Sequence, residues 1–157
     1  MEFHLHTRPK KTPFSLAEQN RLRTLAVENI HAQFIPNKEI LKIFLIGSSV
    51  KGAFGAYEAP GFRGSLFSDF DFIFIVKDTY TIPDRLEREP DGKPFADDAL
   101  NLAYRQKNFV EEKYDAELFF IRESSLQQET FCTAAESAGI PSSEESQYPH
   151  LVIYRAP

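Results

Sequence analysis

At 157 residues, the chain is long enough for one domain with a hydrophobic core and short for two. Hydrophobic residues make up 42% of it, and 15 phenylalanines with no tryptophan predict a globular domain with a Phe-rich core. The formal net charge of -5 argues against extended binding along a nucleic-acid backbone, and the single cysteine, Cys132, excludes an internal disulfide and a multi-cysteine metal site. No segment resembles a signal peptide or a membrane span, so we expect a cytoplasmic protein without membrane contact.

The first third of the chain predicts a strand, a helix and a second strand. Polar and apolar residues alternate over residues 2–7, which is typical of an edge strand. Residues 13–34 have a helical pattern, and Ser15 with Glu18 three residues later forms the capping-box signature of a helix N-terminus. The continuous apolar run Ile40–Ile46 is typical of a strand that is covered on both faces. The inner side of the helix is expected to comprise Leu16, Leu22, Leu25, Val27, Ile30 and Phe34.

The rest of the chain alternates between predicted strands and predicted helices. Unbroken apolar runs indicate the strands, and apolar residues spaced by three or four indicate the helices. Because there is no internal repeat and no clear linker, we expect a single α/β or α+β domain over residues 1–157. In chain order the elements are a strand at Asp69–Val76, an exposed connection at 77–94, a helix at 95–113, a strand at Tyr114–Ile121, a helix at 125–139 and a short strand at 150–155.

Two carboxylates stand at the start of the strand Asp69–Val76. Asp69 and Asp71 are two residues apart, so on a strand their side chains point to the same face. Burying charges without a partner is costly, whereas hard cations such as Mg²⁺ prefer oxygen ligands, and pairs of such metals are used in phosphoryl and nucleotidyl transfer. The alternative is that the strand begins at the surface and the two Asp residues cap a loop.

The segment "IGSSVKG" follows the first apolar strand and has the residue types of a phosphate-binding turn. It offers Gly47, the hydroxyls of Ser48 and Ser49, and the cation of Lys51. Backbone N–H groups of such a turn can also donate hydrogen bonds to a phosphate. The spacing from Gly47 to the next glycine fits a Walker A loop, but Ala and Phe follow where that motif requires Lys and Ser or Thr. We therefore interpret the segment as a different kind of nucleotide-binding turn.

Together these motifs resemble the DNA-polymerase-β-type nucleotidyltransferase superfamily, especially its minimal members. The shared pattern is an apolar strand, then "GSSVKG", then "SDFDFIFIV", then a third acidic strand, and it covers about half of the chain, from Ile40 to Ile121. The resemblance implies a nucleotidyltransferase fold, with a mixed β-sheet and helices packed mainly on one side. It also implies that Gly47 and Ser48 contact the phosphates of a nucleoside triphosphate, expected to be ATP, and that Asp69 and Asp71 bind two Mg²⁺ ions.

The third carboxylate implied by the resemblance has two candidates. Asp115 and Glu117 lie on the same face of the strand Tyr114–Ile121. If this strand and the strand of Asp71 end at similar depth, Glu117 lies level with Asp71, which favours Glu117, although the family more often uses Asp. In the family this residue helps to bind the catalytic metal and can activate the attacking hydroxyl.

The sequence departs from the minimal members by fifteen residues, Ala53–Phe67, between the Gly-Ser turn and the Asp pair. With four Gly or Pro residues and three Phe, this insertion is expected to lack regular structure and to be mobile in the isolated protein. One interpretation is a loop that contacts a substrate or a second subunit, and the other is a flexible elaboration without a role.

The activity implied by the resemblance is transfer of a nucleoside monophosphate from ATP to an acceptor hydroxyl on a protein, an RNA end or a small molecule. Minimal members of the superfamily often act as antitoxins that nucleotidylate an all-helical toxin, so a partner of this kind is implied by analogy. One alternative is a catalytically silent binding or regulatory module that keeps the fold. Another is a metal-dependent phosphodiesterase that uses the same carboxylates.

Overall fold

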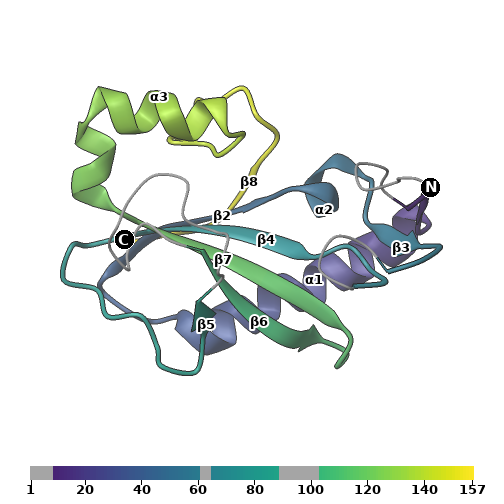
Figure 1. The fold of residues 1–157 in the computed structure, drawn as a ribbon. Helices are drawn as coiled ribbons and strands as arrows, with labels where there is room; N and C mark the ends of the chain where they lie inside the picture. Colours follow the sequence, from purple (N-terminus) through teal and green to yellow (C-terminus); the bar gives the residue numbers. More distant parts are fainter. Residues whose placement is uncertain (1–8, 61–64, 89–102) are drawn as a thin grey trace.

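A six-stranded mixed sheet forms the centre of the protein (Figure 1). The structure is a computed structural model, and it describes residues 9–60, 65–88 and 103–157. The strand order is β5-β6-β7-β4-β2-β8, with β4 and β7 parallel and the other neighbouring pairs antiparallel. A separate two-stranded sheet pairs β1 with β3. The expectation of an α/β domain with a mixed sheet is confirmed. The strands are β1 (Lys11–Pro13), β2 (Ile40–Ile46), β3 (Gly55–Tyr57), β4 (Phe70–Val76), β5 (Glu87–Arg88), β6 (Ala103–Val110), β7 (Tyr114–Arg122) and β8 (Leu151–Arg155).

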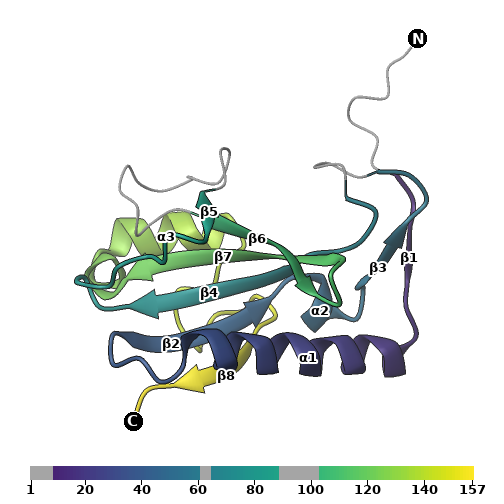
Figure 2. The ribbon, with the colours of Figure 1, turned by 90° about the horizontal axis from the view of Figure 1, so that it is seen from below.

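The helix α1 (Leu16–Phe34) covers one face of the sheet (Figure 2). Alternate side chains of β4 and β7 point toward this helix, because successive side chains of a strand point to opposite faces. The ring of Phe34 lies 4.8 Å from that of Phe74, in an edge-on arrangement. The shared core includes Leu22, Ala26, Ile30 and Phe34 of α1 and Phe70, Phe72, Phe74, Leu118 and Phe120 of the sheet.

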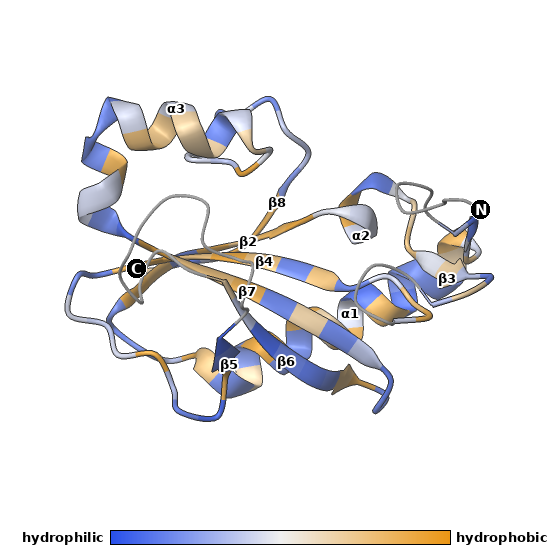
Figure 3. Ribbon diagram, viewed as in Figure 1, coloured by the Kyte–Doolittle hydropathy of each residue, from blue (hydrophilic) through white to orange (hydrophobic). Residues whose placement is uncertain are grey.

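The opposite face of the sheet is covered in part by α3 (Glu129–Ser137), which follows a 3₁₀ turn at Glu123–Gln127 (Figures 1 and 2). The expectation that helices pack mainly on one side is therefore wrong for α3. α3 packs on the second face because β2, β4 and β7 are apolar on both faces, so that both faces are covered by helices. Figure 3 shows the hydrophobic character of these central strands. The core under α3 includes Phe44, Ile73, Ile75, Phe119, Ile121, Phe131 and Ala135.

The N-terminus of α1 forms as the capping signature predicts. Ser15 is the N-cap residue, and its hydroxyl accepts a hydrogen bond from the backbone N–H of Glu18 at 3.1 Å. The predicted inner side of the helix is wrong at its first position, because Leu16 is 71% exposed. Gln19 is buried in its place and has a structural role near the candidate site.

The helix predicted over residues 95–113 is wrong in its described part, which forms the strand β6 and the turn that follows it. β6 pairs with β7 as an antiparallel hairpin, and the turn between them places Glu111 and Glu112 at positive φ. The cross-strand contacts of a hairpin outweigh the local helical pattern of this segment. Residues 95–102 lie outside the described part of the chain, as does the strand predicted at residues 2–7.

The remaining predicted elements agree with the structure to within a few residues at their ends. The strands β2 and β7, the strand β8 and the helix α3 form where the sequence predicts them. The strand predicted from Asp69 begins one residue later, at Phe70. The exposed connection predicted at 77–94 contains the short strand β5, and its residues 89–94 lie outside the described part.

Candidate functional site

The Gly-Ser turn after β2 brings the end of that strand against β4. β2 ends at Ile46, which lies opposite Asp71 in the antiparallel pairing of the two strands. Gly47 follows with φ 80° and ψ -157°, a conformation that is essentially restricted to glycine. A β-carbon at residue 47 would lie 2.3 Å from Asp71 Oδ2, so glycine is also required for space. The turn therefore holds its backbone directly against the Asp71 carboxylate.

The other residues predicted to bind phosphate form the short helix α2 (Ser48–Lys51). Ser48 is half-buried and Lys51 is exposed, so both can be reached from solvent. Ser49 is only 2% exposed, and its hydroxyl has no hydrogen-bond partner within the described part of the chain. Gly52, the C-cap residue that follows the helix, has φ 77°. The structure thus places Ser48 and Lys51 at the surface of the turn and Ser49 beneath it.

Asp71 and Glu117 are direct neighbours across the central pair of strands. In the parallel pairing of β4 and β7, Asp71 lies opposite Glu117, so the level position predicted for Glu117 is confirmed. Adjacent strands lie about 4.8 Å apart, and residues at the same level point to the same face. On this face the apolar cover of α3 lies over Ile73 and Phe119, two residues further along each strand. The two carboxylates therefore stand where the covered part of the α3 face ends.

Arg105 is the principal residue of this site that sequence reasoning missed. It lies opposite Glu117 in the pairing of β6 with β7, and its side chain is 9% exposed. Its Nη1 atom lies 3.2 Å from Asp69 Oδ2, and its Nη2 atom lies 3.2 Å from Asp115 Oδ2. The planar guanidinium can bind two carboxylates at once, which suits it to this position. The sequence of β6 has no polar–apolar alternation, so no local signal places Arg105 on a strand.

Asp115 is held by two neighbours on the β6–β7 hairpin. Besides the ion pair with Arg105, its Oδ1 atom accepts a hydrogen bond from the backbone N–H of Asn108 at 2.9 Å. Asn108 has φ 56°, so this bond fixes an irregular point of β6. The structure therefore groups Asp115 with Arg105 and the hairpin, and it places Glu117 between Asp71 of β4 and Arg105 of β6.

Gln19 of α1 fixes the backbone that leads out of the Gly-Ser turn. Its side-chain amide nitrogen donates hydrogen bonds to the carbonyls of Phe14 at 2.8 Å and Gly52 at 3.1 Å. Its side-chain oxygen accepts a hydrogen bond from the backbone N–H of Phe54 at 3.2 Å. These three bonds satisfy a polar side chain that is 4% exposed, and they anchor the end of α2 to α1.

The insertion Ala53–Phe67 is packed in its described part, which corrects the expectation that it lacks regular structure. It contains β3, which pairs with β1, and Ala56 forms a bridge with Phe67. The ring of Phe54 is 1% exposed and stacks 4.4 Å from Phe70. The pairing partner of β3 is β1, which lies on the other side of α1 in the chain and not within the insertion. Residues 61–64 of the insertion lie outside the described ranges.

The donor atoms of these residues decide whether the site can hold a metal ion. In residues 9–60, 65–88 and 103–157, no three His, Cys, Asp or Glu side chains are grouped so that they could hold a metal ion. Asp69 and Asp115 face Arg105, while Asp71 lies against Gly47. Mg²⁺ commonly binds one or two carboxylates and completes its shell with water and substrate phosphates. The adjacent oxygen donors of Asp71 and Glu117 fit a Mg²⁺ ion that arrives together with a nucleotide.

Comparisons with known proteins do not assign the chain to a family. No family model matches it, and no curated protein matches its sequence. Within the described ranges, the helices lack the combination of length and apolar character that crossing a membrane requires. The chemistry proposed for the protein therefore rests on the residues around Gly47, Asp71 and Glu117.

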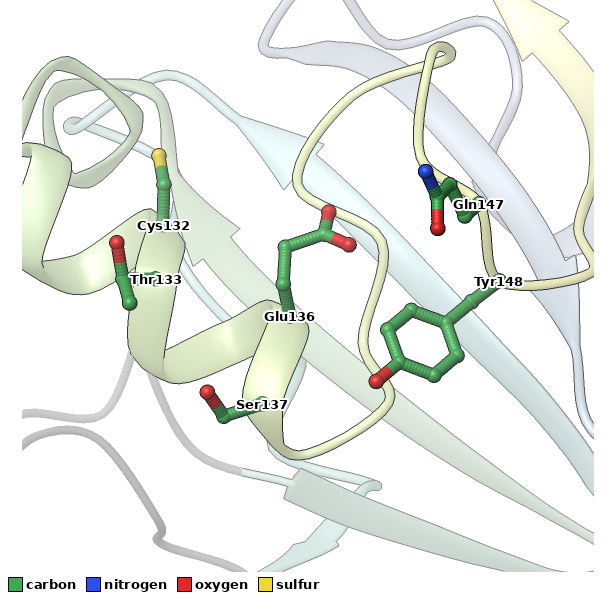
Figure 4. A pocket seen from close by; sticks show the side chains of 6 residues that line it. All are labelled: Cys132, Thr133, Glu136, Ser137, Gln147 and Tyr148. Atoms are coloured by element: carbon green, nitrogen blue, oxygen red, sulfur yellow. The ribbon is translucent and has the colours of Figure 1, made fainter.

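A large open cavity lies away from these carboxylates, between α3 and the loop that precedes β8 (Figure 4). Its volume is about 660 Å³. Glu136 in its wall accepts hydrogen bonds from the side chains of Ser142 at 2.9 Å and Ser146 at 2.8 Å, so this carboxylate ties the loop to α3. The lining residues are Cys132, Thr133, Glu136, Ser137, Gln147 and Tyr148.

Proposed function

We propose that this protein is a metal-dependent nucleotidyltransferase that moves a nucleoside monophosphate from ATP to an acceptor hydroxyl. The observation that carries the proposal is the contact of the Gly47 turn with Asp71, which itself lies level with Glu117. A Gly-Ser turn offers N–H and hydroxyl donors to phosphate, and adjacent carboxylates offer oxygen donors to cations. Donors for both parts of a Mg²⁺-nucleotide complex therefore lie side by side.

In the proposed reaction, the acceptor oxygen forms a bond to the α-phosphorus of ATP. The bond from that phosphorus to the oxygen that bridges to the β-phosphate breaks, and pyrophosphate leaves with the electron pair. Glu117 accepts the proton of the acceptor hydroxyl, Ser48 donates a hydrogen bond to a phosphate oxygen, and Lys51 adds positive charge. Mg²⁺ would be held by Asp71 and Glu117, and by Asp69 once Arg105 has turned away from it. The bound ion would lower the pKa of the hydroxyl and neutralise charge on the phosphates.

Arg105 favours a second candidate function, a catalytically silent binding module. Its guanidinium pairs with Asp69 and Asp115, so a fixed positive charge already stands among the carboxylates. Under the first proposal, Arg105 turns away from Asp69 when metal and nucleotide bind. In a silent module, Arg105 keeps this position permanently and takes the place of a metal ion.

The proposal covers three classes of acceptor: a protein side chain, an RNA end and a small molecule. A partner protein of the toxin kind belongs to the first class, and it is proposed by analogy alone. The formal net charge of -5 disfavours a long nucleic-acid acceptor that would be bound along its backbone.

The test is incubation of the protein with ATP labelled at the α-phosphate, Mg²⁺ and a cell lysate, followed by separation of labelled protein, RNA and small molecules. We expect label transfer by the wild type and none by Asp71→Asn. Asp84→Asn is the matched control, because it removes the same charge at an exposed position beyond the far end of β4. Calorimetric titration with ATP and Mg²⁺ separates the two candidates, since a silent module shows no metal-dependent nucleotide affinity. Absence of both transfer and metal-dependent binding would overturn the proposal.

A further inference from the structure

A second cavity adjoins the carboxylates on the side of the β6–β7 hairpin. It has a volume of about 310 Å³, and we call it the hairpin pocket. Liquid water occupies about 30 Å³ per molecule, so the pocket has room for a group of several heavy atoms. Its wall combines the hairpin with residues 65–67 at the end of the insertion. The lining residues are Ser65, Leu66, Phe67, Arg105, Lys107, Asn108, Lys113 and Asp115.

The wall of the hairpin pocket carries an excess of positive charge. Three of its side chains are cationic and one, Asp115, is a carboxylate. Arg105 pairs with two carboxylates, Asp69 and Asp115, at 3.2 Å from each, so the lysines Lys107 and Lys113 leave the group with a net excess of one positive charge. In a chain with a formal net charge of -5, a concave surface of this sign is suited to an anion.

Both lysines are positioned by features of the hairpin and the insertion. The pairing of β6 with β7 shifts register between Gln106 and Val110, and such irregularities redirect side chains next to functional sites. Lys107 lies in this irregular segment and is exposed. The ammonium of Lys113 lies 5.3 Å from the ring centroids of both Phe67 and Tyr114, a cation–π arrangement that holds it at the pocket wall.

The pocket and the Gly-Ser turn flank the carboxylates from opposite sides. The turn adjoins Asp71 from the side of β2, and Arg105 adjoins Glu117 from the side of β6. Three strand spacings separate β2 from β6, about 14 Å in total. A group bound in the pocket is therefore separate from the phosphates of a nucleotide bound at the turn.

We infer that the hairpin pocket binds a phosphate group carried by the acceptor. A phosphate monoester has three strong acceptor oxygens and close to two negative charges at neutral pH, which suits it to the two lysines of the pocket wall. A phosphate in this position lies next to the strand that carries Glu117, the proposed base. Its assignment to the acceptor rests on the proposed function, whereas the binding of phosphate itself does not.

The first arm of the test measures phosphate binding without metal or nucleotide. Inorganic phosphate is titrated into ¹⁵N-labelled protein in the presence of EDTA. NMR follows the backbone amide signal of Asn108, whose N–H lies at the pocket wall. A titration with sodium chloride of equal ionic strength is the control. We expect saturable shifts, weakened about fivefold or more by Lys107→Gln or Lys113→Gln, the loss typical of one charge-assisted contact. Lys38→Gln is the matched control, because this exposed lysine precedes β2, at the end of that strand opposite to Gly47.

Absence of saturable shifts at Asn108, or an equal loss of affinity in Lys38→Gln, would overturn the phosphate site. Because both lysines are exposed or held at the surface, their removal is expected to leave the fold intact, and thermal melts of each variant check this. Neither result depends on nucleotidyl transfer, so failure of the pocket and failure of the proposed function remain distinguishable.

The second arm separates an acceptor phosphate from the γ-phosphate of ATP. Inorganic phosphate is titrated into protein saturated with Mg²⁺ and a non-hydrolysable ATP analogue, and affinity for the analogue is measured in the wild type and in Lys107→Gln. For an acceptor site, phosphate still shifts the Asn108 signal and analogue affinity is unchanged in the variant. If the analogue abolishes the phosphate response and Lys107→Gln weakens the analogue, the pocket holds the nucleotide and the assignment to the acceptor is wrong.

Discussion

A β-carbon at Gly47 would lie 2.3 Å from the Oδ2 atom of Asp71, so the Gly-Ser turn and the central carboxylate are in direct contact. The antiparallel pairing of β2 with β4 creates this contact, because it sets Ile46 opposite Asp71. Glu117 then lies beside Asp71 through the parallel pairing of β4 with β7. The position of the carboxylates therefore depends on the backbone of residue 47.

Replacing Gly47 with alanine is expected to disturb both the backbone and the site. The conformation at φ 80° costs a non-glycine residue about 1–3 kcal/mol, and the new β-carbon displaces the Asp71 carboxylate. Urea unfolding should show the lower stability, and calorimetry should show loss of Mg²⁺-ATP binding. Gly52→Ala is the control: it has φ 77° but no atom within 4 Å of its added β-carbon, so it should lose stability and still bind ATP. Equal nucleotide affinity in Gly47→Ala and wild type would contradict the placement of ATP at the turn.

Replacing Arg105 with methionine is expected to destabilise the protein by about 3 kcal/mol, the lower end of the range for a broken buried ion pair. The reason is that Asp69 and Asp115 lose the cation that lies 3.2 Å from each of them. Urea unfolding of the variant measures this loss. Adding Asp69→Asn and Asp115→Asn to the variant should restore part of the stability. An Arg105→Met protein as stable as the wild type would show that the ion pairs are not structural.

Removing the carboxylate of Glu144 is expected to lower stability in a pH-dependent way. Hydrogen bonds from Arg155 and Lys42 lower the pKa of Glu144 from its usual 4.5 to about 2. Because the folded state binds this proton more weakly than the unfolded chain, the stabilisation is full above pH 4.5 and is lost as the pH falls toward 2. Thermal melts should show Glu144→Gln below wild type at pH 7, with the difference shrinking between pH 4.5 and 2. Glu145→Gln removes the same charge next in the chain, and a similar loss there would argue against a specific role for Glu144.

Truncating Phe54 is expected to destabilise the protein by about 3–5 kcal/mol, as is typical for a buried phenylalanine replaced with alanine. Its ring is 1% exposed and stacks on Phe70 at 4.4 Å, directly before Asp71 on β4. Leu66→Ala in the same insertion is the control, because Leu66 is 47% exposed and its loss should change stability by less than about 0.5 kcal/mol. If both variants unfold at the same urea concentration, the insertion is not packed as the structure describes.

The sequence by itself determined the elements whose patterns depend on local chemistry. β2, β4 and β7 could be predicted because a strand covered on both faces is a continuous apolar run. The start of α1 could be predicted from Ser15, since a hydroxyl at the N-cap satisfies a backbone N–H that the helix leaves unpaired. Even the level position of Glu117 with Asp71 follows from counting the apolar residues after each carboxylate in strands of similar depth.

The tertiary structure alone decided the position of β6 and the surroundings of the carboxylates. The segment that contains Arg105 has a helical pattern, and only its pairing with β7 makes it a strand. The ion pair of Arg105 with Asp69 joins residues 36 positions apart, through the registers of β4, β7 and β6 together. The packing of the insertion likewise depends on β1, which lies before α1 in the chain. Such contacts cannot be inferred from neighbouring residues, because their stabilisation appears only when strands distant in sequence pair and exclude water from the charges between them.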